Sequence, residues 1–264
     1  MKTRNCLMLA LASAAACVSS AFGYTVALSP GSYQSGIGGE FTATVNDDSL
    51  DAYLGTYGLS STGNAVANTF QTFCIEYQEH FSYNTPYTAD VSGAAKLGGT
   101  LTQDIVSVGT GWLYSQFAQG LLTTTTHGSY FTGSAIRKTQ AGQLQNAIWW
   151  LEGEITTSQA ANPFIIAAST FFGIAPAATV PTASPSSGGL GLAGDSLGTY
   201  SAAGFGVYAL NLGPLTSGAT KHQDQLIFKA TGNREVPDGG TTLLLLGMTV
   251  TGMGALQRKM RKPA

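Results

Sequence analysis

Charged residues, histidine and cysteine are all scarce in this sequence. Asp, Glu, Lys and Arg together make up 10 % of its 264 residues, well below the roughly one quarter that is typical of soluble domains. The formal net charge is −2, so the chain has no basic field for nucleic acid, and we expect no nucleic-acid partner. The aromatic content of 10 % is sufficient for a core and argues against a wholly disordered chain. Low charge with abundant Gly, Ser and Thr favours an exported, β-rich protein over a cytosolic enzyme.

Residues 1–23 have the pattern of a secretory signal peptide. Lys2 and Arg4 supply a positive start, and residues 7–18 form an apolar run that is too short for an ordinary membrane anchor. Small residues then stand where signal peptidase reads the chain, which predicts cleavage after Gly23. A buried N-terminal helix and a lipoprotein signal are the alternatives.

A turn, an apolar stretch and a basic cluster follow one another in residues 236–264. The apolar stretch, residues 241–256, predicts a transmembrane helix that, at about 1.5 Å per residue, reaches most of the way across a bilayer core of roughly 30 Å. Basic residues favour the cytoplasmic side, so we expect a membrane anchor with the preceding domain outside. The turn consists of Val236, Pro237, Asp238, Gly239 and Gly240, and the basic cluster of Arg258, Lys259, Arg261 and Lys262.

This C-terminal arrangement resembles the PEP-CTERM class of bacterial sorting signals, and its VPDGG spelling is most similar to the VPDSG-CTERM variant. Gly239 stands where that variant has Ser. The resemblance implies an exosortase-type membrane protease as a partner, which cuts near the motif and passes the protein to the cell surface or the exopolysaccharide matrix. A plain tail anchor is the alternative. The motif specifies a destination and gives no molecular activity.

The intervening residues 24–235 are expected to form one extracellular α+β domain, mainly β-sheet with two short amphipathic helices. Alternating and β-branched segments predict strands over residues 41–45, 68–77, 81–89, 206–212 and 224–229, with 81–89 as the hairpin partner of 68–77 and the last two rejoining the early sheet. Apolar residues at helical spacing predict helices over residues 111–122 and 138–154. Residues 173–198, rich in Gly, Pro and Ser, are expected to form a loose loop within the domain.

With cleavage after Gly23, Cys74 is the one cysteine of the mature chain. A free cysteine is often a small buried hydrophobe, and its apolar strand suits that interpretation. It could also pair with another chain or act as a nucleophile. A cysteine hydrolase needs a base, usually histidine, and no family signature surrounds Cys74, so we do not expect an enzyme.

Two short motifs give Cys74 another interpretation. Phe73-Cys74-Ile75-Glu76 follows an aromatic–Cys–aliphatic–acidic pattern, and the segment starting at Gln145 follows Gln-x-Ala-Ile-Trp. In this order and spacing they resemble the thioester domains of surface adhesins from Gram-positive bacteria. The resemblance implies that the Cys74 sulfur attacks the Gln145 side-chain carbonyl, releasing ammonia and leaving an internal thioester.

The sequence departs from the adhesin pattern at Leu144, where Thr is common. The helical pattern places Gln145 at the edge of the apolar face, where its carboxamide would point into the domain or along the boundary of that face instead of into solvent. Trp149 and Trp150 are the candidates for keeping water away from the bond.

Other site chemistries have weaker support. Asp47, Asp48 and Asp51 lack the calcium-loop pattern of an EF-hand, and Glu76, Glu79 and His80 do not share one face of a strand. Glu152 and Glu154 point in different directions on a helix, which argues against a glycosidase pair. We therefore expect no metal and no cofactor.

The sequence as a whole predicts an exported protein, first membrane-anchored and then at the cell surface or in the extracellular matrix, with an adhesive or structural role. Attachment through the thioester to an amine-bearing surface ligand or exopolysaccharide is the sharper hypothesis. The alternative is a non-covalent matrix or carbohydrate-binding module in which Cys74 only packs.

Overall fold

The computed structural model describes residues 24–45, 68–96, 104–130, 134–174, 200–213 and 222–229. The predicted signal peptide, nearly all of the predicted loop at 173–198 and the whole C-terminal sorting segment lie outside these residues.

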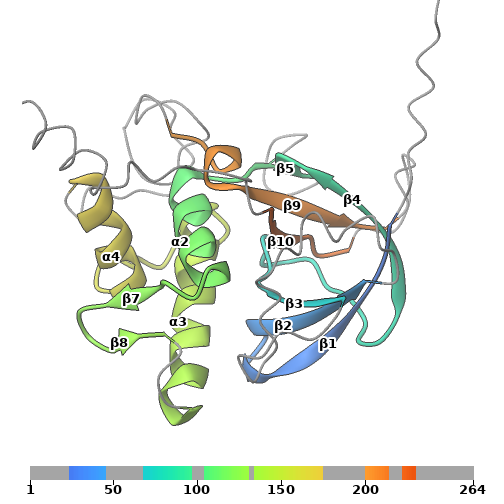
Figure 1. Ribbon diagram of the computed structural model, residues 1–264, viewed down its shortest axis with the longest axis horizontal. Helices are drawn as coiled ribbons and strands as arrows, with labels where there is room; N and C mark the ends of the chain where they lie inside the picture. Colours follow the sequence, from blue (N-terminus) through green and yellow to red (C-terminus); the bar gives the residue numbers. More distant parts are fainter. Residues whose placement is uncertain are drawn as a thin grey trace, which may run out of the picture.

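A six-stranded sheet forms one half of the described chain, and every strand pair in it is antiparallel (Figure 1). Along the sheet the strands run in the order β10-β9-β4-β1-β2-β3. The strands are β1 (Tyr24–Ser35), β2 (Gly38–Val45), β3 (Thr69–Thr72), β4 (Pro86–Ser92), β9 (Val207–Leu212) and β10 (Gln225–Phe228).

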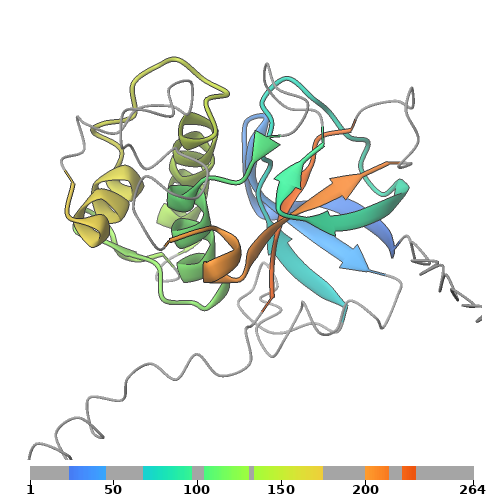
Figure 2. The same cartoon turned by 90° about the horizontal axis from the view of Figure 1, so that it is seen from above.

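The sheet curls until its two edges meet, as Figure 2 shows from above. Beyond β3 the chain forms an antiparallel bridge with β10 at Cys74 and Gln225. The Leu226 N–H donates to the Phe73 carbonyl at 3.0 Å, and the Thr72 hydroxyl donates to the Leu226 carbonyl at 2.6 Å. We call these contacts between residues 72–75 and 224–226 the seam. Closure satisfies backbone groups that an open edge would expose.

The helices form a layer beside the sheet (Figures 1 and 2). They are α2 (Val108–Ala118), α3 (Ser134–Leu151) and α4 (Pro163–Phe172). The Ser107 side chain caps α2, and Asn162 caps α4 ahead of a proline, as helix starts require. The remaining elements are short: β5 (Ala94–Ala95), β6 (Asp104–Ile105), β7 (Thr123–Thr124), β8 (Gly128–Ser129) and the 3₁₀ turn η4 (Ala203–Phe205).

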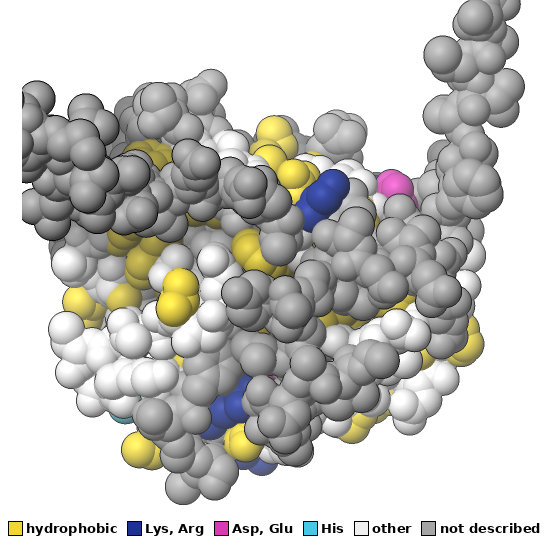
Figure 3. Space-filling model, in the orientation of Figure 1, with side chains coloured by type: hydrophobic (Ala, Val, Ile, Leu, Met, Phe, Trp, Pro, Cys, Tyr) yellow, Lys and Arg dark blue, Asp and Glu magenta, His cyan; other side chains and the backbone are white. Residues whose placement is uncertain are grey.

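Two large apolar cores result from the alternation of side chains along the strands. One core fills the inside of the curled sheet and includes Val26, Leu28 and Leu210. The other lies between the helices and the opposite face of the sheet, to which β9 contributes Val207 and Ala209. On the face seen in Figure 3, few charged side chains appear among uncharged polar and hydrophobic ones.

The prediction of a mainly β domain with few helices is confirmed, as is the return of the late strands to the early sheet. The hairpin between residues 68–77 and 81–89 was a wrong prediction, because β4 pairs with β1 and β9 instead of β3. Helices α2 and α3 lie close to the two predicted helices at 111–122 and 138–154. The number of helices is corrected, because the described residues include α4 as a further helix. The 10 residues of α4 are nearly all apolar, and periodicity alone cannot distinguish a short apolar helix from a buried strand.

A buried ion pair joins the sheet to α3. Arg137 of α3 donates from Nε to Glu40 Oε1 and from Nη2 to Glu40 Oε2, both at 2.8 Å. The Tyr130 hydroxyl donates to Glu40 Oε1 at 2.6 Å. The two charged side chains are only 5 % and 0 % exposed. This geometry satisfies both carboxylate oxygens, which a buried charge requires.

We expect Arg137→Met to lower the free energy of unfolding by about 3–5 kcal/mol, because Glu40 is then left as an uncompensated buried charge. The double variant Arg137→Met/Glu40→Leu should recover most of the loss. Urea unfolding measures both. Asp90→Asn, which removes an exposed pair with Lys96, is the control and should cost about 0–1 kcal/mol. If Arg137→Met lost as little stability as this control, the result would contradict a stabilising buried ion pair between Arg137 and Glu40.

Candidate functional site

Cys74 lies at the seam, where the end of the β3 strand meets β10. The Ile75 N–H donates to the Asp224 carbonyl at 3.0 Å, and the Leu226 N–H donates to the Phe73 carbonyl. These bonds flank the bridge, so Cys74 and Gln225 form a non-hydrogen-bonded pair, in which side chains come closest. The N–H and C=O of Cys74 itself therefore point away from β10.

Gln145 of α3 binds those two backbone groups. The Cys74 N–H donates to Gln145 Oε1 at 3.0 Å, and Gln145 Nε2 donates to the Cys74 carbonyl at 2.8 Å. The carboxamide thus takes the place of a peptide group of a neighbouring strand. Gln145 is 1 % exposed. Burying its carboxamide without hydrogen-bond partners would cost free energy.

Gly38 of β2 makes room for this arrangement. A Cβ atom at this position would lie 2.5 Å from Gln145 Cγ and 2.7 Å from Trp149 Cη2. Only glycine allows the helix side chains to come this close to the β2 backbone.

The Cys74 sulfur has a different glutamine as its neighbour. Gln225 Nε2 lies 3.4 Å from Sγ, and Gln225 Oε1 lies 3.8 Å from it. Cys74 is a free, fully buried cysteine. Burial raises the pKa of its thiol, the hydrogen bond from Gln225 lowers it, and the nearby Glu76 raises it further. The raised pKa keeps the sulfur protonated, and a thiol is a poor nucleophile unless a neighbouring group removes its proton.

Aromatic side chains pack beside Cys74. Cys74 packs in one cluster with Phe41 and Trp149. The Trp149 indole N–H donates to the Glu76 carbonyl at 3.1 Å, and Tyr77 meets the Trp149 ring edge-on at 4.9 Å. Trp150, the other predicted shielding residue, is buried in the core between helices and sheet. The structure therefore places only Trp149 beside Cys74.

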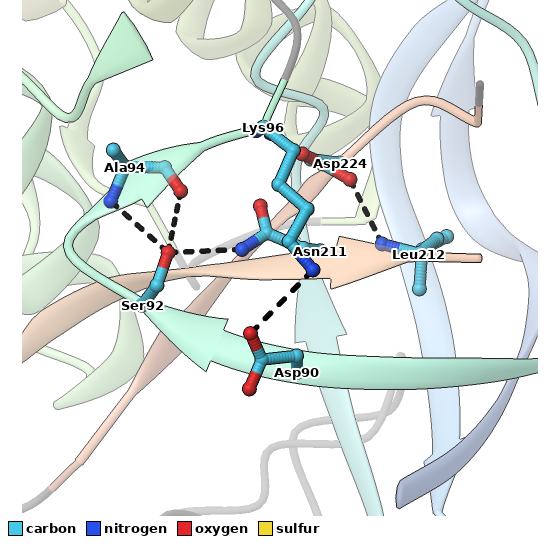
Figure 4. Close-up of polar contacts among 7 residues, drawn as sticks. All are labelled: Asp90, Ser92, Ala94, Lys96, Asn211, Leu212 and Asp224. Atoms are coloured by element: carbon cyan, nitrogen blue, oxygen red, sulfur yellow. Dashed lines mark hydrogen bonds and ion pairs between the residues drawn. The ribbon is translucent and has the colours of Figure 1, made fainter. Parts of the chain in front are cut away.

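Two buried carboxyl groups lie next to the seam. Glu76 Oε2 accepts the Asp224 N–H at 2.6 Å, and Asp224 accepts the N–H groups of Leu212 and Lys96 at 2.8 Å each; Figure 4 shows the Asp224 carboxylate facing Leu212. Burial raises the pKa of Glu76 to about 10, with the Asp224 charge adding to the effect. Burial also raises the pKa of Asp224 to about 7, against the two N–H donors.

The other candidates from the sequence have structural partners. Glu152 accepts the Ser107 hydroxyl at 2.7 Å, and Glu154 accepts the Tyr77 N–H at 2.9 Å. Among the described residues no group of three His, Cys, Asp or Glu side chains is placed to hold a metal ion. Asp47, Asp48 and Asp51 lie outside the described residues.

The sequence motifs singled out Cys74 and Gln145, which the structure places in contact, but gave no sign of Gln225, Gly38 or Asp224. Gln225 begins the short strand β10. Its contact with Cys74 joins residues 151 positions apart, and no local pattern connects them. Glu76 appeared in the sequence only as a motif residue and a weak metal candidate, because its burial depends on the closed seam.

Comparison with known proteins supports the C-terminal prediction. The VPDSG-CTERM motif matches residues 235–260, the segment with the VPDGG turn, the apolar stretch and part of the basic cluster. The match supports a sorting-signal protein that is exported and surface-associated. No curated protein and no solved structure matches the chain. In the part of the chain that the structure describes, no helix has the length and apolar character needed to cross a membrane; the predicted helix at 241–256 lies outside that part.

We expect Gly38→Ala to lower the free energy of unfolding by about 1–3 kcal/mol, because the new methyl group displaces Gln145 and Trp149. Gly93→Ala is the matched control, since a Cβ there meets nothing within 4 Å. Equal stability of the two variants would show that Gln145 does not need a glycine at position 38 to reach its place.

The free energy of unfolding should fall as the pH rises. Glu76 and Asp224 keep their protons in the folded protein at pH values where the unfolded chain has lost them, so the folded state binds more protons. The fall begins near pH 4, extends to about 7 for Asp224 and about 10 for Glu76, and has a slope of up to about 1.4 kcal/mol per pH unit for each group.

Denaturant unfolding over this pH range tests the prediction. Glu76→Gln should flatten the slope. A wild-type protein that gains stability with rising pH would contradict the assignment of these buried protons.

Proposed function

Because the C-terminal segment carries a surface-sorting motif, we propose that this chain is an adhesive or structural protein of the cell surface that attaches covalently through a Cys74–Gln145 thioester. Its acceptor is an amine or hydroxyl on a surface ligand or on exopolysaccharide. An exosortase-type protease processes the C-terminal segment, so the protein is membrane-anchored first and reaches the cell surface or extracellular matrix afterwards.

The placement of the Gln145 carboxamide on Cys74 is the observation that carries this proposal. Two hydrogen bonds, at 3.0 and 2.8 Å, hold the carboxamide against the residue that bears the sulfur. Such preorganisation is what a slow acyl transfer needs from a protein. Both residues are at most 1 % exposed, so a thioester formed here would be protected from hydrolysis.

The reaction is balanced without any added reagent. The sulfur adds to the Gln145 carboxamide carbon, the carbon–nitrogen bond breaks, and the thiol proton leaves with ammonia. The carboxamide turns from the Cys74 backbone to its sulfur, which gives up two hydrogen bonds worth about 1 kcal/mol each. An amine or hydroxyl that later attacks the thioester forms a new acyl bond and returns the proton to sulfur.

A second candidate function is a non-covalent matrix or carbohydrate-binding module. The contact of the sulfur with Gln225 instead of Gln145 favours it, because the hydrogen bonds of Gln145 then have a purely structural purpose. Exposed aromatic rings that could stack on sugars belong to Tyr83, Phe171 and Tyr200, which are 44 %, 49 % and 39 % exposed.

The intact mass of the exported protein, purified without reductant or amine buffers, separates the two candidates. We expect a mass lower than the sequence mass by one ammonia, with peptide mapping assigning the loss to Cys74 and Gln145. The Cys74→Ala and Gln145→Ala variants should each lack the loss. Methylamine should add to wild type at Gln145 and free one thiol.

An unmodified mass with one alkylatable thiol after unfolding would exclude the thioester. Retention on exopolysaccharide that persists in Cys74→Ala would then support the non-covalent module.

A further inference from the structure

The neighbour of the Cys74 sulfur is fixed by an interaction that the two sequence motifs do not include. Gln225 is fully buried, and its Nε2 lies 3.4 Å from Sγ. The same Nε2 donates to the Gln223 carbonyl at 3.1 Å. Because a carbonyl can only accept, this second bond fixes which end of the carboxamide is the amino group. An N–H donor is therefore directed at the sulfur.

Any reaction of the thioester places negative charge on this sulfur. When an amine attacks the acyl carbon, the carbon–sulfur bond breaks and Cys74 leaves with the electron pair before it takes up the proton of the amine. In formation, the sulfur develops the same charge as its proton is transferred toward the departing ammonia. Cys74 is fully buried and packs with Phe41 and Trp149, so a charge on its sulfur depends strongly on local donors.

We propose that Gln225 is a catalytic residue of the thioester chemistry, whose side-chain N–H stabilises the Cys74 sulfur as it gains negative charge in the formation and opening of the bond. This role rests on the proposed function. Gln145 supplies the acyl group and Gln225 remains chemically unchanged. A hydrogen bond to a charged, buried atom corresponds to a rate effect of about 10- to 100-fold.

The local structure suits this division of roles. Gln225 reaches the sulfur from β10, across the seam, while Gln145 reaches the backbone of the same residue from α3. The two carboxamides therefore approach Cys74 from different elements. The bond between the Cys74 sulfur and Gln145 can form or break while the Gln225 N–H stays at the sulfur.

The test compares methylamine opening of the thioester in the exported wild-type protein with that in Gln225→Met, followed by mass spectrometry. Methionine keeps a similar volume but removes the donor. The matched control is Gln223→Met, which removes a buried carboxamide that donates to the Glu76 carbonyl instead of to the sulfur. We expect Gln225→Met to open about 10- to 100-fold more slowly and Gln223→Met to open at close to the wild-type rate.

Equal rates in wild type and folded Gln225→Met, with the thioester present in both, would overturn the role of Gln225 and leave the proposed function intact. Equal slowing in both variants would reduce Gln225 to a packing residue. An unmodified wild-type mass would instead overturn the proposed function and this inference with it.

Should Gln225→Met fail to fold, the side-chain amide protons of Gln225 in ¹⁵N-labelled wild type provide the answer. Opening with methylamine replaces the thioester sulfur by a thiol or thiolate and should shift these protons, and unchanged resonances would overturn the proposal.

Discussion

The closure of the sheet at Cys74 is the constraint on which the rest of the structure depends. One residue has β10 on one side and the Gln145 carboxamide on the other. The first contact closes the six-stranded sheet, and the second ties the closed sheet to the helical layer. Gln145 is needed at this point because the Cys74 N–H and C=O point away from β10, and unsatisfied buried peptide groups are costly.

Polar groups buried around the seam are arranged in pairs. Glu40 and Arg137 neutralise each other between β2 and α3. Glu76 and Asp224 are neighbours, and burial raises the pKa of both carboxyl groups. A chain with only 10 % charged residues places several of them inside. Their positions hold the junction of sheet and helices in one geometry, and this rigidity is what the proposed acyl chemistry at Cys74 requires.

Periodicity in the sequence was sufficient to predict β2, β9, β10 and the inward position of Gln145, because each depends on local alternation or helical spacing. It failed for β1, in which the alternation of the first residues stops at Pro30 and Gly31, where the pairing register shifts. It also failed for the pairing of β4, since partner choice is set by the closed sheet and not by neighbours in sequence. Gln225 could not be found from sequence, because its role arises only when two distant edge strands meet. The C-terminal sorting motif was predictable because its turn, apolar stretch and basic residues are contiguous.

A crystal structure of the exported protein, at a resolution that separates the carboxamide atoms, tests the central claim most directly. The account predicts Cys74 between β10 and α3, with Gln225 Nε2 at the sulfur and continuous density from Sγ to the Gln145 carboxamide carbon. A sheet left open between β3 and β10, or a Gln145 side chain turned away from Cys74, would contradict it.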